Sequence, residues 1–172
     1  METIKITNTN NQLTAHFNEQ EFYLASRNPN QEFNTPAIFP QAAEILRDWD
    51  NKDNSDSYEG MKLTSTMRSD DPPGYPHSEG LAFDTISLEH NTAYLANFKQ
   101  ECENYINGKG SELIDNLRAI GIDGFGIEEY CVHLDAGFMV GNRTDKYGNY
   151  RVFVFTYHMD NGKMVVDSNY AM

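Results

Sequence analysis

The chain has 172 residues, of which 13 are Lys or Arg and 26 are Asp or Glu, so its formal net charge is −13 with neutral histidines. A chain of this length can form one domain that closes its core without a metal ion or disulfide as a staple. Because the acidic residues are spread along the chain, no basic cluster is available for nucleic-acid phosphates or anionic membrane surfaces, and we expect no nucleic-acid partner.

The sequence carries no recognisable membrane span or secretion signal. No apolar run approaches the roughly 18–20 residues that a membrane helix needs. The opening METIKITNTNNQLT is polar and lacks the apolar stretch of a signal peptide. We therefore expect synthesis in the cytoplasm and no membrane insertion. Cys102 and Cys131 are the only cysteines, and they are expected as two reduced thiols in or near the core.

The first part of the chain predicts an arm followed by a helix. Residues 1–34 are rich in Asn and Gln with isolated apolar residues, which favours an N-terminal arm wrapped on a single domain of residues 1–172. Pro36 and Pro40 precede the segment 41–49, whose apolar spacing predicts a short amphipathic helix.

Both strand and helix patterns occur in the rest of the chain. The predicted elements after residue 60 are, in chain order, strand 61–66, strand 81–88, helix 92–106, helix 112–120, strand 128–138, strand 151–157 and strand 164–166. Glycines at 121, 124 and 126 predict a tight connection into strand 128–138. Because the order shows no regular βαβ alternation, it favours an α+β domain with a mostly antiparallel sheet and flanking helices.

The residues that can carry chemistry gather in two short segments, HSEGLAFD and HLD. A catalytic zinc site takes three protein ligands from His and carboxylate side chains and leaves one position for water. His77, Asp84 and His133 supply such a set if the chain turns between the first two. Gly80 allows that turn. The sequence therefore predicts a Zn²⁺ site.

The two segments also resemble a known family. HxxGxAxD followed by a strand-borne HxD resembles the zinc D-Ala-D-Ala carboxypeptidase and L-Ala-D-Glu endopeptidase family of peptidoglycan hydrolases, whose fold is related to the hedgehog signalling domain. LTSTMRSDDPPGYPH is similar to the family's TSxxRS segment before its first histidine ligand, and GIDGFGIEEYCVHLDAG is similar to the approach to its last one. The resemblance covers roughly residues 12–137 and is most specific over 64–84 and 121–137. It implies a hedgehog-like fold.

The resemblance implies His77, Asp84 and His133 as the zinc ligands. Arg68 matches the family's arginine, which holds a substrate carboxylate or stabilises charge on the scissile carbonyl oxygen; a surface salt bridge is the alternative for this residue. Asp135 lies two positions beyond His133, so strand geometry places it on the same face, where it can accept a ring N–H. An exposed carboxylate at the end of the strand is the alternative.

The general base is where the sequence departs from the family. Many members have Asp or Glu three residues before the last histidine, and that position is Tyr130. In an extended strand Glu129 shares a face with His133 while Glu128 points away, so we expect Glu129 as the base. A bulge among the preceding glycines would reverse that choice in favour of Glu128. By the same parity, Cys131 is expected as a small core residue beside the site rather than as a fourth ligand.

These features predict a zinc metallopeptidase that hydrolyses peptidoglycan stem or cross-link peptides, as a carboxypeptidase or an endopeptidase. We expect an endolysin-like or accessory hydrolase that acts at the cell wall after phage-type release or non-classical export. The alternative, suggested by Tyr130, is a structural or interaction module of the same fold that binds zinc without catalytic activity.

Overall fold

The computed structural model describes residues 2–27, 31–52, 60–71, 73, 75–128, 130–136, 153–160 and 163–171. The helices of these segments are α1 (Glu19–Leu24), α2 (Phe39–Asn51), α3 (Asn91–Ile106) and α4 (Glu112–Ala119). Their strands are β1 (Thr3–Ile6), β2 (Phe33–Pro36), β3 (Met61–Ser65), β4 (Ala82–Ser87), β5 (Gly124–Ile127), β6 (Val132–Asp135), β7 (Phe153–Asp160) and β8 (Lys163–Ala171). In these segments no helix is long and apolar enough to cross a membrane.

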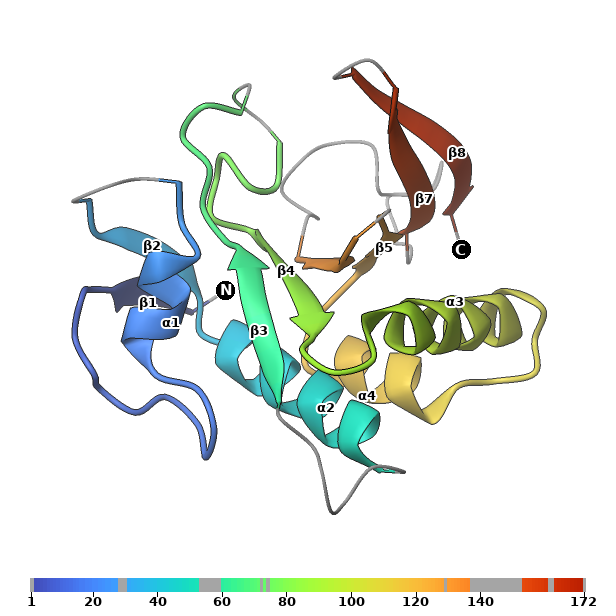
Figure 1. The fold of residues 1–172 in the computed structure, drawn as a ribbon, viewed down its shortest axis with the longest axis horizontal. Coiled ribbons are helices and arrows are strands. Elements are labelled where there is room, and N and C mark those ends of the chain that lie inside the picture. Colours follow the sequence, from blue (N-terminus) through green and yellow to red (C-terminus); the bar gives the residue numbers. More distant parts are fainter. Residues whose placement is uncertain are drawn as a thin grey trace.

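Two sheets organise the described part of the chain (Figure 1). The smaller pairs β1 with β2, and the larger has the strand order β3-β4-β6-β5-β7-β8. Neighbouring strands of the larger sheet are antiparallel except for β5 and β7, which are parallel. The predicted α+β class with a mostly antiparallel sheet is therefore confirmed.

Strand parity gives the larger sheet two unlike faces at β4 and β6. Phe83 and Leu134 are fully buried in the core that the helices cover, and the Phe83 ring centroid lies 5.0 Å from that of Phe39 in α2. Successive side chains of a strand point to opposite faces. Asp84 and His133, which neighbour these core residues along the chain, are therefore directed to the opposite face.

Five of the predicted helices and strands lie close to their expected positions. The segment 41–49 lies inside α2, and the predicted helices 92–106 and 112–120 correspond to α3 and α4. The predicted strands 61–66 and 81–88 correspond to β3 and β4. The N-terminus of α4 is capped by Ser111, whose hydroxyl accepts the backbone N–H of Ile114 at 3.1 Å. Local patterns were sufficient for the helices, each of which buries one apolar face. β4 differs, because residues on both of its faces are buried.

The N-terminal segment is more structured than an arm. It contains β1, α1 and β2, none of which the sequence analysis predicted, and it buries Phe17 and Phe22 completely or nearly so. Hydrogen bonds join it to the residues directly after β3. The Thr66 hydroxyl donates to the Phe22 carbonyl at 2.9 Å, and the Thr66 N–H donates to the Ala25 carbonyl at 3.2 Å. The Arg27 N–H donates to the Met67 carbonyl at 2.9 Å. The segment therefore braces the loop that follows β3.

The predicted connection at residues 121–126 is wrong in part, because Gly124 begins β5, a strand between β6 and β7. Gly124 lies opposite Asp135 in β6, and a Cβ atom at this position would overlap the Asp135 carboxylate. Glycine is thus required by a close side-chain approach within the sheet and not by a turn. The predicted strand 128–138 is shorter in the structure, which has β6 at Val132–Asp135; residues 137 and 138 lie outside the described part.

Candidate metal centre

Two of the candidate ligands meet through the register of the sheet. Asp84 in β4 is paired directly with His133 in β6, and Ala82 is paired with Asp135. Opposite residues of antiparallel strands project to the same face, so the carboxylate and the imidazole lie side by side on the face away from the helices. Asp84 is 1% exposed and His133 is 4% exposed. These two candidate ligands therefore lie on inner strands of the sheet and are shielded from solvent.

His77 reaches the same point from the loop between β3 and β4. Its Nδ1–H donates to the carbonyl oxygen of Thr66, and its own carbonyl accepts the N–H of Arg68 at 3.1 Å. Gly80 has a φ of +68°, a backbone conformation that favours glycine, and its carbonyl accepts the Thr35 hydroxyl at 2.9 Å. The turn that the sequence assigned to Gly80 is thus present and is anchored at both ends.

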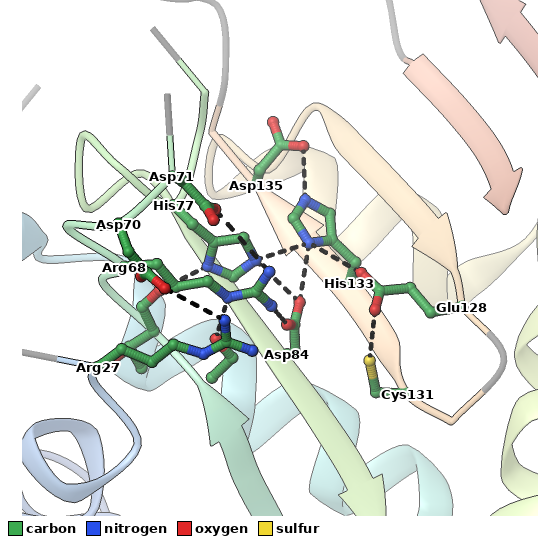
Figure 2. A network of polar contacts seen from close by, with 12 residues as sticks. Arg27, Arg68, Asp70, Asp71, His77, Asp84, Glu128, Cys131, His133 and Asp135 are labelled. Carbon is green, nitrogen blue, oxygen red and sulfur yellow. Dashed lines mark hydrogen bonds and ion pairs between the residues drawn. The ribbon is translucent and has the colours of Figure 1, made fainter. Parts of the chain in front are cut away.

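Three atoms that could ligate a metal ion, one from each of these residues, form a small triangle (Figure 2). His77 Nε2 lies 3.1 Å from Asp84 Oδ1 and 3.2 Å from His133 Nδ1, and the third edge, His133 Nδ1 to Asp84 Oδ1, is 2.8 Å. Ligands bound at about 2.0–2.1 Å around a tetrahedral ion lie about 3.3 Å apart. The buried group of His77, Asp84 and His133 could therefore hold a metal ion.

In each imidazole, the ring nitrogen outside the triangle has a hydrogen-bond partner, and this partner determines the protonation of the inner nitrogen. His77 Nδ1 faces the Thr66 carbonyl, and His133 Nε2 faces Asp135 Oδ2 at 3.1 Å. Both partners are pure acceptors, so these nitrogens carry the protons of the neutral rings. The inner nitrogens then direct lone pairs at each other and at a carboxylate oxygen. Such a set is stable only with a cation, either a proton or a metal ion, at its centre.

Arg68 holds the remaining oxygen of Asp84. Its Nη2 donates to Asp84 Oδ2, its Nε donates to the Ser65 hydroxyl at 2.5 Å, and its Nη1 lies 3.9 Å from Asp71 Oδ2. The Arg68 side chain is 17% exposed. The guanidinium therefore turns Oδ1 of Asp84 toward the two imidazoles, so the contacts of Arg68 are those of a residue that orients a ligand.

Glu128 brings a second carboxylate to the centre, although strand parity predicted that it would point away. Its Oε1 lies 3.8 Å from His133 Nδ1, and its Oε2 accepts the Cys131 thiol at 3.1 Å. The expectation failed because strand pairing stops at Ile127, and the Glu128 N–H bonds to the Cys131 carbonyl at 2.9 Å, where the chain turns toward β6. Glu129, the expected base, lies outside the described residues.

Burial and charge act against each other at the centre. Burial alone would raise the pKa of Asp84, but the His77 and His133 rings outweigh it and hold that pKa well below its usual range. Burial alone would lower the pKa of His133, but its bonds to Asp135 and Asp84 raise it to about 10. A positive charge at His133 is therefore favoured by the carboxylates around it.

The carboxyl and thiol of the neighbouring pair shift in the other direction. Burial, reinforced by the charge of Asp84, raises the pKa of Glu128 to about 7. Burial also raises the pKa of the Cys131 thiol. Cys131 forms a compact group with Glu128 and Asp84, whose donor atoms lie within 4.8 Å of one another. The pair thus adjoins the candidate metal centre through Asp84, which belongs to both groups.

The structure brings together every described residue that the sequence proposed for the site: Arg68, His77, Asp84, Glu128, His133 and Asp135. Ser65 and Thr66, which support Arg68 and His77, were not assigned a role. Ser65 is the first serine of the TSxxRS pattern noted in the sequence, which was the available signal for it. Thr66 supports His77 through its backbone carbonyl, which leaves no signal in the sequence.

Comparisons with known proteins add no relative. No family model, no curated protein and no solved structure matches the chain. The resemblance of HSEGLAFD and HLD to the peptidase family thus stays a prediction. The chemistry of the centre is therefore inferred from the geometry of its side chains.

Proposed function

We propose that the protein is a zinc-dependent peptidase acting on peptidoglycan stem or cross-link peptides. The observation that carries the proposal is the buried triangle of His77 Nε2, Asp84 Oδ1 and His133 Nδ1, with the carboxylate of Glu128 beside it. Three protein ligands with one open position are typical of catalytic zinc, whereas structural zinc is closed by four. The proximity of a further carboxylate favours hydrolysis.

Zinc suits the donor set. Two imidazole nitrogens and one carboxylate oxygen match its preferred ligands, whereas Mg²⁺ and Ca²⁺ prefer oxygen. The Thr66 carbonyl and the Asp135 carboxylate hold the outer nitrogens, as partners of metal-bound histidines commonly do. When bound, zinc supplies a polarised scissile carbonyl and a water of lowered pKa.

The protein's own residues then divide the remaining work. Glu128 accepts the proton of the attacking water and returns it to the leaving amine, a task that requires a carboxylate within hydrogen-bond reach of the reacting atoms. Arg68 keeps Asp84 in its ligating orientation and places a positive charge next to the centre. Asp135 holds the His133 ring with Nδ1 inward.

The substrate class rests on the resemblance of the two ligand-bearing segments to peptidoglycan peptidases. Two exposed aromatic side chains flank these segments: Tyr75, which is 51% exposed and precedes His77 by two residues, and Tyr130, which is 67% exposed. Tyr75 stands where many members of the family have a serine, and Tyr130 stands where many have a carboxylate. We expect them to affect the choice of peptide and to leave metal binding unchanged. The cell wall is the proposed site of action.

A zinc-binding module without activity is the second candidate. Tyr130 favours it, because this exposed residue occupies the position where many family members carry their catalytic carboxylate. The presence of Glu128 at the centre favours the peptidase instead. The two candidates differ in one outcome, the release of peptide fragments.

Zinc-loaded protein incubated with purified sacculi and soluble muropeptides tests both candidates. We expect new amine termini and shortened peptides by mass spectrometry, and His77→Ala and His133→Ala should lose both bound zinc and hydrolysis. His90→Ala is the matched control, because His90 contacts Asp50 and, among the described residues, belongs to none of the groups that could hold a metal ion. Zinc binding without fragment release would favour the inactive module, and full hydrolysis by His133→Ala would refute the site.

A further inference from the structure

We propose that Cys131 is a positioning residue whose thiol holds the Glu128 carboxylate beside the open position of the metal centre. The inference rests on the proposed function, since it assigns Cys131 a task only if Glu128 is the base. It extends that function to a residue that neither binds the metal ion nor touches the substrate.

The two oxygens of Glu128 face different partners (Figure 2). Oε2 accepts the Cys131 thiol at 3.1 Å, whereas Oε1 lies 3.8 Å from His133 Nδ1, one of the ligand atoms. A base that serves a catalytic zinc must present one oxygen to the water at the open position. The thiol contact leaves Oε1 for that purpose and restrains the carboxylate through the other oxygen.

Glu128 needs this restraint because of its place in the chain. It follows the last residue of β5, so strand pairing no longer fixes its direction. A glutamate side chain loses considerable rotamer freedom when it is ordered. Cys131 restrains both parts of Glu128: its carbonyl accepts the Glu128 N–H at 2.9 Å and holds the backbone, and its thiol donates to the carboxylate and limits the rotamers of the side chain.

A thiol is a suitable donor for this purpose. It is a weak donor, so it restrains the carboxylate while leaving it basic, whereas an Arg or Lys partner would stabilise the charged form and reduce its basicity. Cys131 is 8% exposed, so water competes little for the contact. Among the described residues, its compact group is formed with Asp84 and Glu128, while the metal group is formed by His77, Asp84 and His133. Asp84 belongs to both groups, and the group with Cys131 could also hold a metal ion, so the proposal requires a direct test of whether the thiol binds metal.

Kinetics of zinc-loaded variants test the role directly. Cys131→Ala should lower kcat about 10-fold, the size expected for loss of one hydrogen bond to a charged group, with KM and the zinc content unchanged. Cys131→Ser retains a donor and should recover most of the rate. Cys102→Ala, which removes the other buried thiol in α3, is the matched control and should keep wild-type kcat. Wild-type kcat in Cys131→Ala would overturn the proposal.

Two spectroscopic measurements decide the contact without any turnover. In the Cys102→Ala background, the infrared S–H stretching band of the zinc-loaded protein reports Cys131 alone. Glu128→Gln should move this band to higher frequency, because a neutral amide oxygen is a weaker acceptor than a carboxylate. With Co²⁺ in place of zinc, we expect no thiolate-to-metal charge-transfer band. An unmoved S–H band, or a charge-transfer band that Cys131→Ser abolishes, would overturn the proposal.

These measurements test the peptidase activity and the contact between Cys131 and Glu128 separately. A zinc-loaded wild-type protein that hydrolyses none of the peptides would refute the peptidase, and the infrared band would still decide whether the thiol holds Glu128. Conversely, an active enzyme with an unmoved band would leave the peptidase in place and remove Cys131 from its mechanism.

Discussion

The candidate ligands and the proposed base of the centre are held by different kinds of structure. Asp84 and His133 face each other across paired strands, so the register of β4 and β6 fixes both. Glu128 lies beyond the end of β5 and depends on contacts with Cys131. Two of the three candidate ligands are thus part of a sheet, whereas Glu128 depends on a short connection. Substitutions at the two places should therefore fail in different ways.

The sharpest test of this difference compares two neighbouring glutamates. Glu128→Gln should retain zinc and lose at least about 100-fold in kcat, because removal of a general base costs that much or more. Glu129→Gln should keep turnover near the wild-type value. Peptide hydrolysis followed by mass spectrometry, with zinc content measured on the same samples, checks both. The reverse pattern would return the base to Glu129, the residue that strand parity favoured.

The sheet-borne side of the comparison is tested at Asp135. Asp135→Asn removes the charge that holds the outer nitrogen of His133, and we expect zinc affinity to fall about 10- to 100-fold, as for other partners of metal-bound histidines. Competition with a chromogenic chelator measures the change. Asp115→Asn, an exposed substitution on α4, is the control. If both variants bind zinc as tightly as the wild type, the sheet orients His133 without help from Asp135.

The same contrast explains which features could be predicted from the sequence. Asp84 and His133 were proposed as neighbours because residue types of a metal site fell in two strand-like segments, and a sheet brings such segments together. The Ser111 cap of α4 has a similar local origin, since capping depends on a few adjacent residues. Both features follow from local patterns, which tertiary contacts then preserve.

What the sequence did not reveal depends on partners far along the chain. β5 has glycine at two of its four positions, and its strand conformation comes from pairing with β6 and β7. The pairing of β1 with β2 joins two short segments on either side of α1. Glu128 was misplaced because parity was extended beyond the last paired residue, Ile127, where the alternation of faces no longer holds.

A pH effect on stability should also follow from the sheet-borne ligands. The pKa of His133 rises from 6.5 to about 10 in the folded chain, mainly through Asp135 and Asp84 once burial has been overcome. A raised pKa contributes stability that is fully present below about pH 6.5 and is lost as the pH rises through about 10. In chelator-treated protein we expect Tm to fall across this interval.

The matched measurement uses His133→Gln, which has no imidazole to titrate. Chelator-treated His133→Gln should lose less thermal stability between pH 6.5 and 10 than the wild type does. Equal losses in the two proteins would show that other groups, and not this imidazole, govern the dependence. Circular dichroism melts at several pH values are sufficient to separate the two results.

The smallest expected effect concerns the bond between the N-terminal segment and the loop of His77. Thr35→Val keeps the shape of the side chain but removes the buried hydrogen bond to the Gly80 carbonyl, so the free energy of unfolding should fall by about 1 kcal/mol. Zinc affinity should fall less than in Asp135→Asn, since His77 keeps its bond to Thr66. Denaturant unfolding and chelator competition measure the two changes, with the exposed Thr3→Val in β1 as control. A loss of zinc affinity as large as that of Asp135→Asn would show that β2 holds the centre as firmly as the larger sheet does. The N-terminal segment would then belong to the structure that positions the ligands.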